Sequence, residues 1–288
     1  MAREQEEFIW ANTDYPYLCL VDKKRTEIFR KAIHKAVKPG SIVVDIGSGT
    51  GIFALFAAEA GAAKVYAVEL EHLLAENLRQ TFFISEHKDV IEVIEGNALE
   101  VDLPKNVDVV IAELIETGLM DEMQVPVMNA LHQAGIVGDK TKVIPQANRT
   151  NLELVHIDDE FYGYKIKAPK HLWPFYDLDS NEWAQPTITA RSNKLTVVDL
   201  NLEDGANNQD VDTILTFKVH KSDKPINAVR ISGVLTLTDG IELGAAHSVN
   251  GDKVLSLPRD ILPTTDEIKV KVSYKMGGGL GSFKVEFL

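Results

Sequence analysis

Cysteine is almost absent from this sequence: Cys19 stands alone among 288 residues. A single thiol excludes a disulfide within the chain and a cysteine-rich zinc site, and we predict no metal centre. The scarcity fits a reducing compartment, so we expect a cytoplasmic protein. No apolar run approaches the ~20 residues that would span a membrane. The opening MAREQEEF does not have the pattern of a secretory signal.

Basic residues are also in short supply, with 30 lysines and arginines against 43 aspartates and glutamates and a formal net charge of −13. Phosphate contacts need basic surface, so this balance argues against a general nucleic-acid binder. It suits a basic protein or peptide, or a small amine, as substrate, although acids can equally serve to keep a protein soluble. The length and the 45% hydrophobic content indicate a globular chain with one large domain or two smaller ones.

A glycine-rich turn between two short apolar runs organises the rest of the chain. The first run, 42–44, ends at Asp45, the second, 65–68, ends at Glu69, and a helix is expected between them over 52–59. The glycines of the turn are Gly47, Gly49 and Gly51. Glycine lets the backbone approach a ligand, a helix N-terminus presents free N–H groups, and an acid can accept hydrogen bonds from both ribose hydroxyls. This order predicts a nucleoside site at the carboxyl ends of parallel strands.

The spacing of the glycines separates this turn from two other nucleotide motifs. A dinucleotide site reads Gly-x-Gly-x-x-Gly, whereas here the third glycine comes one residue earlier, and the Gly-Lys-Ser/Thr of a phosphate loop is absent. Asp-Ile-Gly-Ser-Gly-Thr-Gly at 45–51, with Glu69 closing the next strand, resembles the first motif of class I S-adenosylmethionine (AdoMet) methyltransferases. The resemblance implies AdoMet as cofactor and S-adenosylhomocysteine as product. It also implies that Asp45 orders the turn, that Ser48 and the glycines surround the cofactor, and that Glu69 holds the ribose.

Strands and helices alternate up to residue 146, which predicts a parallel sheet with right-handed crossovers. We expect helices over 22–37, 73–86 and 121–133, and strands over 91–94, 107–112 and 141–144. The binding crevice of such a sheet lies at the carboxyl ends of its strands, where Gly51, Glu69, Asn97 and Glu113 fall. The acid that usually reads adenine in AdoMet methyltransferases is replaced by Leu99, so Asn97 and the backbone of Ala98 are the candidates for that contact.

Beyond Pro145 the pattern changes to alternation of apolar and polar residues, which predicts an antiparallel β-barrel or sandwich. Strands are expected over 194–202, 213–219, 268–274 and 283–287. We divide the chain into an N-terminal helical segment (1–40), a Rossmann-like α/β AdoMet-binding domain (41–146) and a β-rich, barrel-like substrate domain (147–288). The aromatic stretch Phe161–Trp183 could pack one domain on the other, line a substrate site, or meet a second subunit of a homodimer.

Four carboxylates follow the strand expected over 107–112: Glu113, Glu116, Asp121 and Glu122. Some of them must lie near the reactive end of the cofactor, because this strand ends at the crevice. Acids are also favourable at the start of a helix, and one is expected from residue 121. We interpret Asp121 as such a cap, and Glu113 and Glu122 as acids of the site.

The order of elements resembles that of the protein arginine methyltransferases, which have a methyltransferase fold followed by a β-barrel and carry two glutamates nine positions apart at this strand. Glu113 and Glu122 stand nine apart. The resemblance implies that they clamp a guanidinium. Two carboxylates can bind this planar group in bidentate fashion, and they draw its positive charge away from the nitrogen that attacks the methyl group.

The resemblance extends to the segment before the glycine turn. Asp22-Lys-Lys-Arg25-Thr26 resembles the family's Asp-x-x-Arg-Thr, whose arginine holds the AdoMet carboxylate. From the residues alone, Arg25 could instead be a surface arginine. The resemblance further implies that His247 pairs with Asp22, although a lone histidine is commonly structural. Two positions depart from the family: Ser248 replaces a tryptophan of the arginine pocket, and Glu116 replaces a small residue.

Three functions remain open. The first is N-methylation of a guanidinium or amine by the double-glutamate loop, as in protein arginine methyltransferases. The second is AdoMet-dependent methylation of a small molecule or of a protein site other than arginine, which the departures at Ser248 and Glu116 favour. The third is a catalytically silent interaction module, against which the intact cofactor motifs argue.

Overall fold

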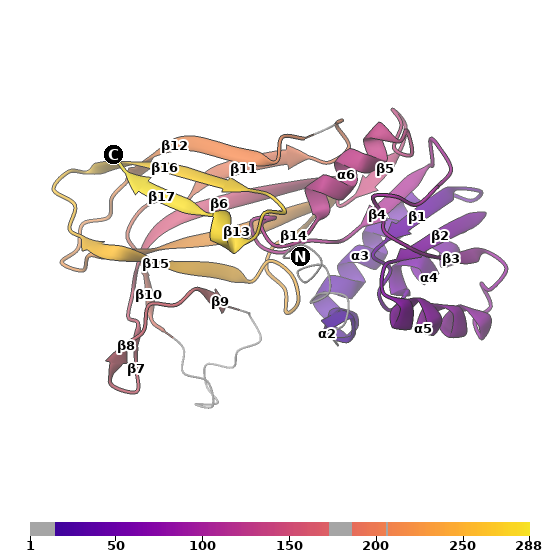
Figure 1. The fold of residues 1–288 in the computed structure, drawn as a ribbon, viewed down its shortest axis with the longest axis horizontal. Helices are drawn as coiled ribbons and strands as arrows, with labels where there is room; N and C mark the ends of the chain where they lie inside the picture. Colours follow the sequence, from indigo (N-terminus) through magenta and orange to yellow (C-terminus); the bar gives the residue numbers. More distant parts are fainter. Residues whose placement is uncertain (1–14, 173–185, 206) are drawn as a thin grey trace.

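The structure, a computed structural model, describes residues 15–172, 186–205 and 207–288. Its elements form two neighbouring parts (Figure 1): helices and a parallel sheet, followed along the chain by antiparallel sheets. This arrangement confirms the predicted fold class. Part of the aromatic stretch Phe161–Trp183, and the beginning of the N-terminal helical segment, lie outside the described residues.

The first part is a five-stranded parallel sheet with helices around it. Its strands are β1 (Ile42–Ile46), β2 (Lys64–Glu69), β3 (Ile91–Glu95), β4 (Val109–Ala112) and β5 (Lys142–Ile144), in the order β3-β2-β1-β4-β5. The helices are α2 (Tyr15–Val21), α3 (Lys23–Ala36), α4 (Ile52–Glu59), α5 (His72–Phe83) and α6 (Gln124–Gln133). The strand order reverses beside β1, so the crevice for a ligand lies beyond the carboxyl ends of β1 and β4. The glycine turn (Gly47–Gly51) follows β1, and residues 113–122, which carry the four acids and are called the acid loop below, follow β4.

The second part is antiparallel. Its seven-stranded sheet contains β6 (Ala147–Ile157), β9 (Lys170–Leu172), β10 (Ile188–Ala190), β11 (Leu195–Asn201), β13 (Ile226–Thr238), β14 (Ile241–Leu243) and β15 (Asp252–Ile261). A three-stranded sheet contains β12 (Asp210–Lys218), β16 (Glu267–Lys275) and β17 (Lys284–Phe287), with the 3₁₀ turn η1 (Leu280–Ser282) before β17. A small hairpin pairs β7 (Glu160–Phe161) with β8 (Tyr164–Lys165).

Helix α3 connects the two parts. Its apolar face buries Phe29, Ala32 and Ile33 completely, and it contacts α4 on one side and β13 and β14 on the other. Asp22 caps its N-terminus by accepting a hydrogen bond from the backbone of Arg25 at 3.1 Å. The two parts therefore share one hydrophobic core at this helix.

Two helix boundaries differ from the sequence expectation. The helix expected over 121–133 begins at Gln124, so the interpretation of Asp121 as its cap is wrong. The Asp121 carboxylate instead accepts the N–H of Leu280 at 2.7 Å and pairs with Lys253 at 2.6 Å, both from the antiparallel part. The helix expected over 73–86 ends at Phe83, and the chain turns there.

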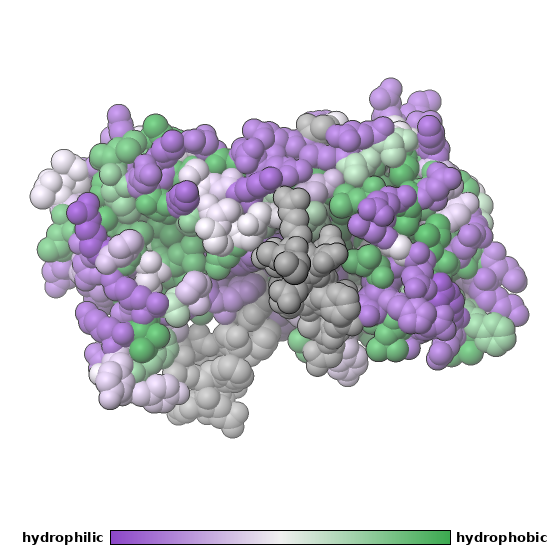
Figure 2. All heavy atoms as spheres, in the orientation of Figure 1, coloured by the Kyte–Doolittle hydropathy of each residue, from purple (hydrophilic) through white to green (hydrophobic). Residues whose placement is uncertain are grey.

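Hydrophilic side chains cover much of the face drawn in Figure 2, over both parts, as expected from the 25% of charged residues. No helix within residues 15–172, 186–205 and 207–288 has the length and apolarity needed to cross a membrane.

Candidate cofactor and substrate site

The glycine turn after β1 has the backbone that the sequence predicts. Gly47, Gly49 and Gly51 have φ values of 68°, 53° and 79°, in the left-handed region where side chains are disfavoured. The N–H groups of Gly47 and Ser48 donate to the Val68 carbonyl at 3.0 Å, which ties the turn to β2. A Cβ atom on Gly51 would lie 2.7 Å from side-chain atoms of α5. The conformation and the close packing both require glycine here.

Two acids flank this turn. Glu69, at the end of β2, accepts the N–H of Gly49 at 2.8 Å and that of Glu71 at 3.0 Å, so its carboxylate lies at the glycine turn. Asp45 is 1% exposed. Burial raises the pKa of Asp45 to about 7 and the charge of Glu69 acts in the same direction, while a hydrogen bond from Ser48 opposes them. No described residue donates a hydrogen bond to Asp45 Oδ2.

Arg25 is buried at the start of α3 and is 5% exposed, so its interpretation as a surface arginine is wrong. Its guanidinium lies over the rings of Phe29 and Phe53, at 5.4 and 4.9 Å from their centroids, and donates to the Cys19 carbonyl at 3.2 Å. It also forms an ion pair with Glu113. Arg25 Nε is buried and has no hydrogen-bond partner among the described residues. Arg25 and Glu113, separate predictions from the sequence, therefore lie together.

Glu113 and Glu122 lie at the two ends of the acid loop, and the structure brings these ends together. The side-chain oxygen of Gln124 accepts the N–H of Leu114 at 2.9 Å, which closes the loop. Glu122 is close enough to Glu113 for that charge to raise the pKa of Glu122. Burial is the larger cause, and together they raise the pKa of Glu122 to about 8.

Glu116 lies in the middle of this loop and is 5% exposed. Both oxygens of its carboxylate have partners. Its carboxylate accepts the N–H groups of Met120 and Asp121, the second at 2.8 Å, and forms an ion pair with Lys253 of β15. Lys253 is not among the site residues predicted from the sequence. A buried acid at position 116 requires a cation as its partner. Nothing in the sequence near Glu116 identifies that cation as Lys253.

Asp22 contacts Ser248. The backbone N–H and the hydroxyl of Ser248 donate to Asp22 Oδ2 at 2.8 and 2.9 Å, and Tyr15 donates to the Ser248 carbonyl at 2.6 Å. Ser248 is 4% exposed, while the neighbouring His247 is exposed. Ser248, where the resemblance leads us to expect tryptophan, thus joins α2 and α3 to the antiparallel part. The pairing of His247 with Asp22 stays a prediction.

Asn97 and Ala98 follow β3, next to Glu69 at the same edge of the sheet. The Gly96 N–H donates to the Glu69 carbonyl at 2.9 Å, and Asn97 Oδ1 accepts the N–H of Leu99 at 3.0 Å. Both positions are half-buried. They lie where the sequence predicts contact with adenine, and this role stays a prediction.

The residues present fit AdoMet. Arg25 Nε and Asp45 Oδ2 are buried polar atoms that no described residue satisfies, and such atoms are costly unless a ligand or water pairs with them. The turn at Gly47–Gly51 allows close approach, and Glu69 stands beside it. The site therefore has a cation that could bind the carboxylate of AdoMet (Arg25), a glycine turn that allows close approach, and an acid that could bind its ribose (Glu69).

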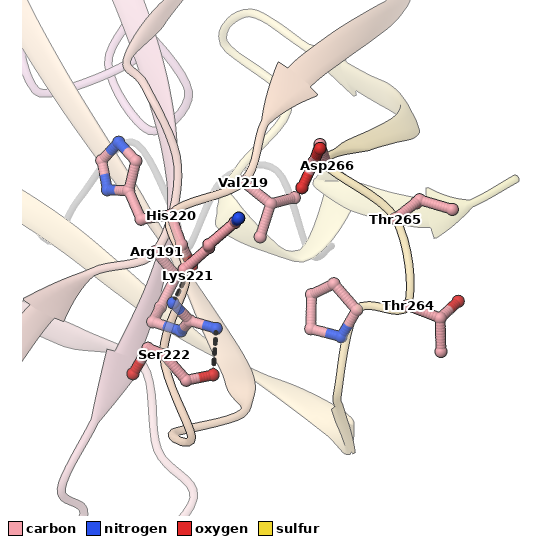
Figure 3. A pocket seen from close by; sticks show the side chains of 9 residues that line it. Arg191, Val219, His220, Lys221, Ser222, Thr264, Thr265 and Asp266 are labelled. Carbon is pink, nitrogen blue, oxygen red and sulfur yellow. Dashed lines mark hydrogen bonds between the residues drawn. The ribbon is translucent and has the colours of Figure 1, made fainter.

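A separate hollow of 230 Å³ lies in the antiparallel part, between residues 219–222 and 263–266 (Figure 3). Arg191 lines it and is 1% exposed. Its guanidinium donates to the carbonyls of His220, Ser222 and Lys224, so it holds the connection between β12 and β13 in place. Strand β13 begins at this connection and extends to α3. The length of β13 therefore separates the hollow from the acid loop.

Comparisons with known proteins show what the chain is similar to. Residues 21–149 match the model of the TRM5/TYW2 methyltransferase domain. An uncharacterized protein of Methanocaldococcus jannaschii, MJ1452, is 29% identical over 269 residues, which are 93% of this chain and 95% of that protein. Protein arginine N-methyltransferase PRMT10 of Oryza sativa subsp. japonica is 40% identical over 102 residues, but these are 35% of this chain and only 26% of the rice protein.

A solved structure has the same fold along nearly the whole chain. The Trypanosoma brucei PRMT1 enzyme–prozyme heterotetrameric complex with AdoHcy aligns with a TM-score of 0.70 and 18% identity, over 93% of this chain and 95% of that one. The fold match covers both the parallel and the antiparallel part.

We predict that Gly51→Ala damages both folding and AdoMet binding, with Gly240→Ala as a matched control. Both glycines have similar left-handed backbones, at 79° and 76°, but nothing lies within 4 Å of a Cβ atom at Gly240. Gly240→Ala should lower the free energy of unfolding by about 1–2 kcal/mol. Gly51→Ala should lower it by about 1–3 kcal/mol more, because the methyl group meets Leu78 and Phe82.

Chemical denaturation measures the first effect and AdoMet titration the second. Equal losses of stability in the two variants, with unchanged AdoMet affinity, would contradict the tight packing described at Gly51.

Proposed function

For a chain that is an AdoMet-dependent methyltransferase resembling the protein arginine methyltransferases, we propose that it transfers a methyl group to a guanidinium nitrogen. One observation carries the proposal: Glu122 is the acid of the loop that forms no ion pair with any described residue. Glu113 has Arg25 as its cation, and Glu116 and Asp121 have Lys253. Glu122 is half-buried, and a carboxylate held beside another favours a cationic ligand.

The proposed substrate site is formed by Glu122 together with Glu113. Glu113 already pairs with the guanidinium of Arg25, which supports its ability to bind such a group. Two carboxylates can hold a planar guanidinium by parallel hydrogen bonds and fix which nitrogen faces the cofactor. They also concentrate its positive charge on the side away from that nitrogen, which leaves a lone pair free to react.

The cofactor residues divide the work of binding AdoMet. Arg25 would hold its methionine carboxylate, Glu69 its ribose, and Asn97 with the Ala98 backbone its adenine. AdoMet supplies a methyl group on a positively charged sulfur. What the protein adds is chiefly position, because holding the nitrogen against the methyl group removes most of the entropic cost of the reaction.

Proton removal accompanies the transfer. The attacking nitrogen gives up one proton as its new bond to carbon forms, and the pair of electrons in the broken bond stays with sulfur. Glu122 suits the role of acceptor, because its pKa of about 8 makes it a stronger base than an exposed glutamate. His247 and Asp22 would support the site from the antiparallel part and α3.

A second candidate is methylation of a small guanidine or amine, and the contact between Ser248 and Asp22 favours it. The tryptophan that resemblance leads us to expect at 248 would wall an arginine pocket, whereas the serine is buried against Asp22. Labelled AdoMet incubated with a cell extract separates the two candidates. Label in protein, released on hydrolysis as methylated arginine, supports a protein substrate, and label confined to small molecules supports the alternative.

Glu122→Gln should abolish transfer to an arginine peptide while leaving AdoMet binding intact. The variant keeps the shape of the side chain and removes its charge, so kcat/KM should fall by about 100-fold or more. Glu242→Gln on β14, an exposed acid, is the matched control and should behave as the unmodified protein. Transfer rates and AdoMet titrations measure both, and normal methylation by Glu122→Gln would refute the guanidinium clamp.

The pH dependence provides a separate test. The pKa of free Glu122 is raised to about 8, so the carboxylate that binds the cation forms as pH rises through this value. At saturating AdoMet, kcat/KM for the arginine peptide should rise by about tenfold per pH unit below 8 and level off above it. A profile that is flat across pH 8 would contradict the role of Glu122.

A further inference from the structure

Lys253 is a buried lysine with a specific pair of partners. It lies on β15, is 4% exposed, and its ammonium contacts Glu116 and Asp121. Lysine is almost never buried unless it is paired. Both partners belong to the loop that carries Glu113 and Glu122, although the lysine comes from the other part of the molecule.

Glu116 gives the loop its shape. One oxygen of its carboxylate accepts the N–H groups of Met120 and Asp121, the two residues directly before Glu122, and the other contacts Lys253. The carboxylate therefore turns the chain back so that Glu122 approaches Glu113. This bond network requires Glu116 to be ionised while buried. Burial lowers the pKa of Lys253 to about 7, but its ammonium contacts two carboxylates, and these contacts favour its charged form.

Lys253 also pairs with Asp121, an acid whose charge acts on Glu122. The adjacent Asp121 raises the pKa of Glu122, and Glu116 lies in the same loop. Without a cation, four carboxylates would share a small volume with Arg25 alone, and the least stabilised of them would take up a proton. The contacts of Lys253 balance the charges of Glu116 and Asp121, the two acids that do not belong to the proposed substrate site.

We propose that Lys253 is a positioning residue for methyl transfer, which pairs with Glu116 and Asp121 so that Glu122 is held beside Glu113 with its charge available to the substrate. The proposal rests on the proposed function of the two glutamates. It adds a residue from the antiparallel part to the catalytic loop, and it explains why an acid can occupy position 116.

The loop has other connections to the antiparallel part, so removing the lysine should not unfold it. Thr117 donates to the Gly251 carbonyl at 2.6 Å, and the N–H groups of Gly277 and Gly279 donate to the Leu119 and Met120 carbonyls at 3.0 and 2.8 Å. These bonds hold residues 117–120 near their present path when the charge of Lys253 is lost, whereas none of them holds Glu122.

The test compares Lys253→Met, Lys253→Arg and the double variant Glu116→Gln/Lys253→Met by kcat, KM, AdoMet affinity and pH profile. Lys253→Met should lower kcat by about 10- to 100-fold through misplacement of Glu122, with AdoMet affinity unchanged. The rise of kcat/KM with pH, called the acid limb here, should shift to higher pH by about one unit, because the unpaired charges of Glu116 and Asp121 raise the pKa of Glu122. Lys253→Arg keeps the charge and should restore the limb.

The double variant removes the lysine and one of its acids, so its limb should lie between those of Lys253→Met and the unmodified protein. If Lys253→Met does not fold, the double variant replaces it in the test, because it leaves one buried acid fewer without a cation. Lys271→Met, which breaks an exposed pair with Asp212 at 3.2 Å, is the matched control and should change nothing. An unshifted acid limb in the folded variants refutes the role of Lys253 alone. Absence of transfer to arginine by the unmodified protein refutes the proposed function instead.

Discussion

The crowding of four carboxylates into one short loop is the constraint on which the site depends. Charges of one sign cannot share a low-dielectric volume unless cations balance them. Arg25 from α3 balances Glu113, and Lys253 from β15 balances Glu116 and Asp121. Within the described residues, Glu122 is thus the carboxylate of the loop that forms no ion pair, and a substrate guanidinium bound between Glu122 and Glu113 would share Glu113 with Arg25.

This balance also explains why the two parts of the molecule are joined where they are. The parallel sheet positions the glycine turn and the start of the acid loop, and helix α3 supplies one of the two cations, Arg25. The other comes from the antiparallel part, as does Ser248, whose hydrogen bonds to Asp22 fix the start of α3 and hence Arg25. Without the antiparallel part, Glu116 and Asp121 would lose Lys253, and Asp22 would lose the hydrogen bonds from Ser248.

Local features of the site could be predicted from the sequence, and features that depend on distant residues could not. The turn at Gly47–Gly51 and the helix over 52–59 follow from glycine spacing and periodicity, which act over a few residues. The pairing of Lys253 with Glu116 joins residues 137 positions apart, and no local pattern reports it. Asp121 was misinterpreted for the same reason: its position favours a helix cap, but Lys253 and Leu280 provide better partners.

The central claim, that Glu113 and Glu122 recognise a guanidinium, is tested most directly by binding. Calorimetric titration of the AdoHcy-loaded protein with an arginine peptide, and with the same peptide carrying lysine, compares a planar bidentate cation with a point charge. The account predicts that arginine binds at least about tenfold more tightly, since the geometry of two carboxylates matches its paired N–H groups. Equal affinity for the two peptides would contradict it.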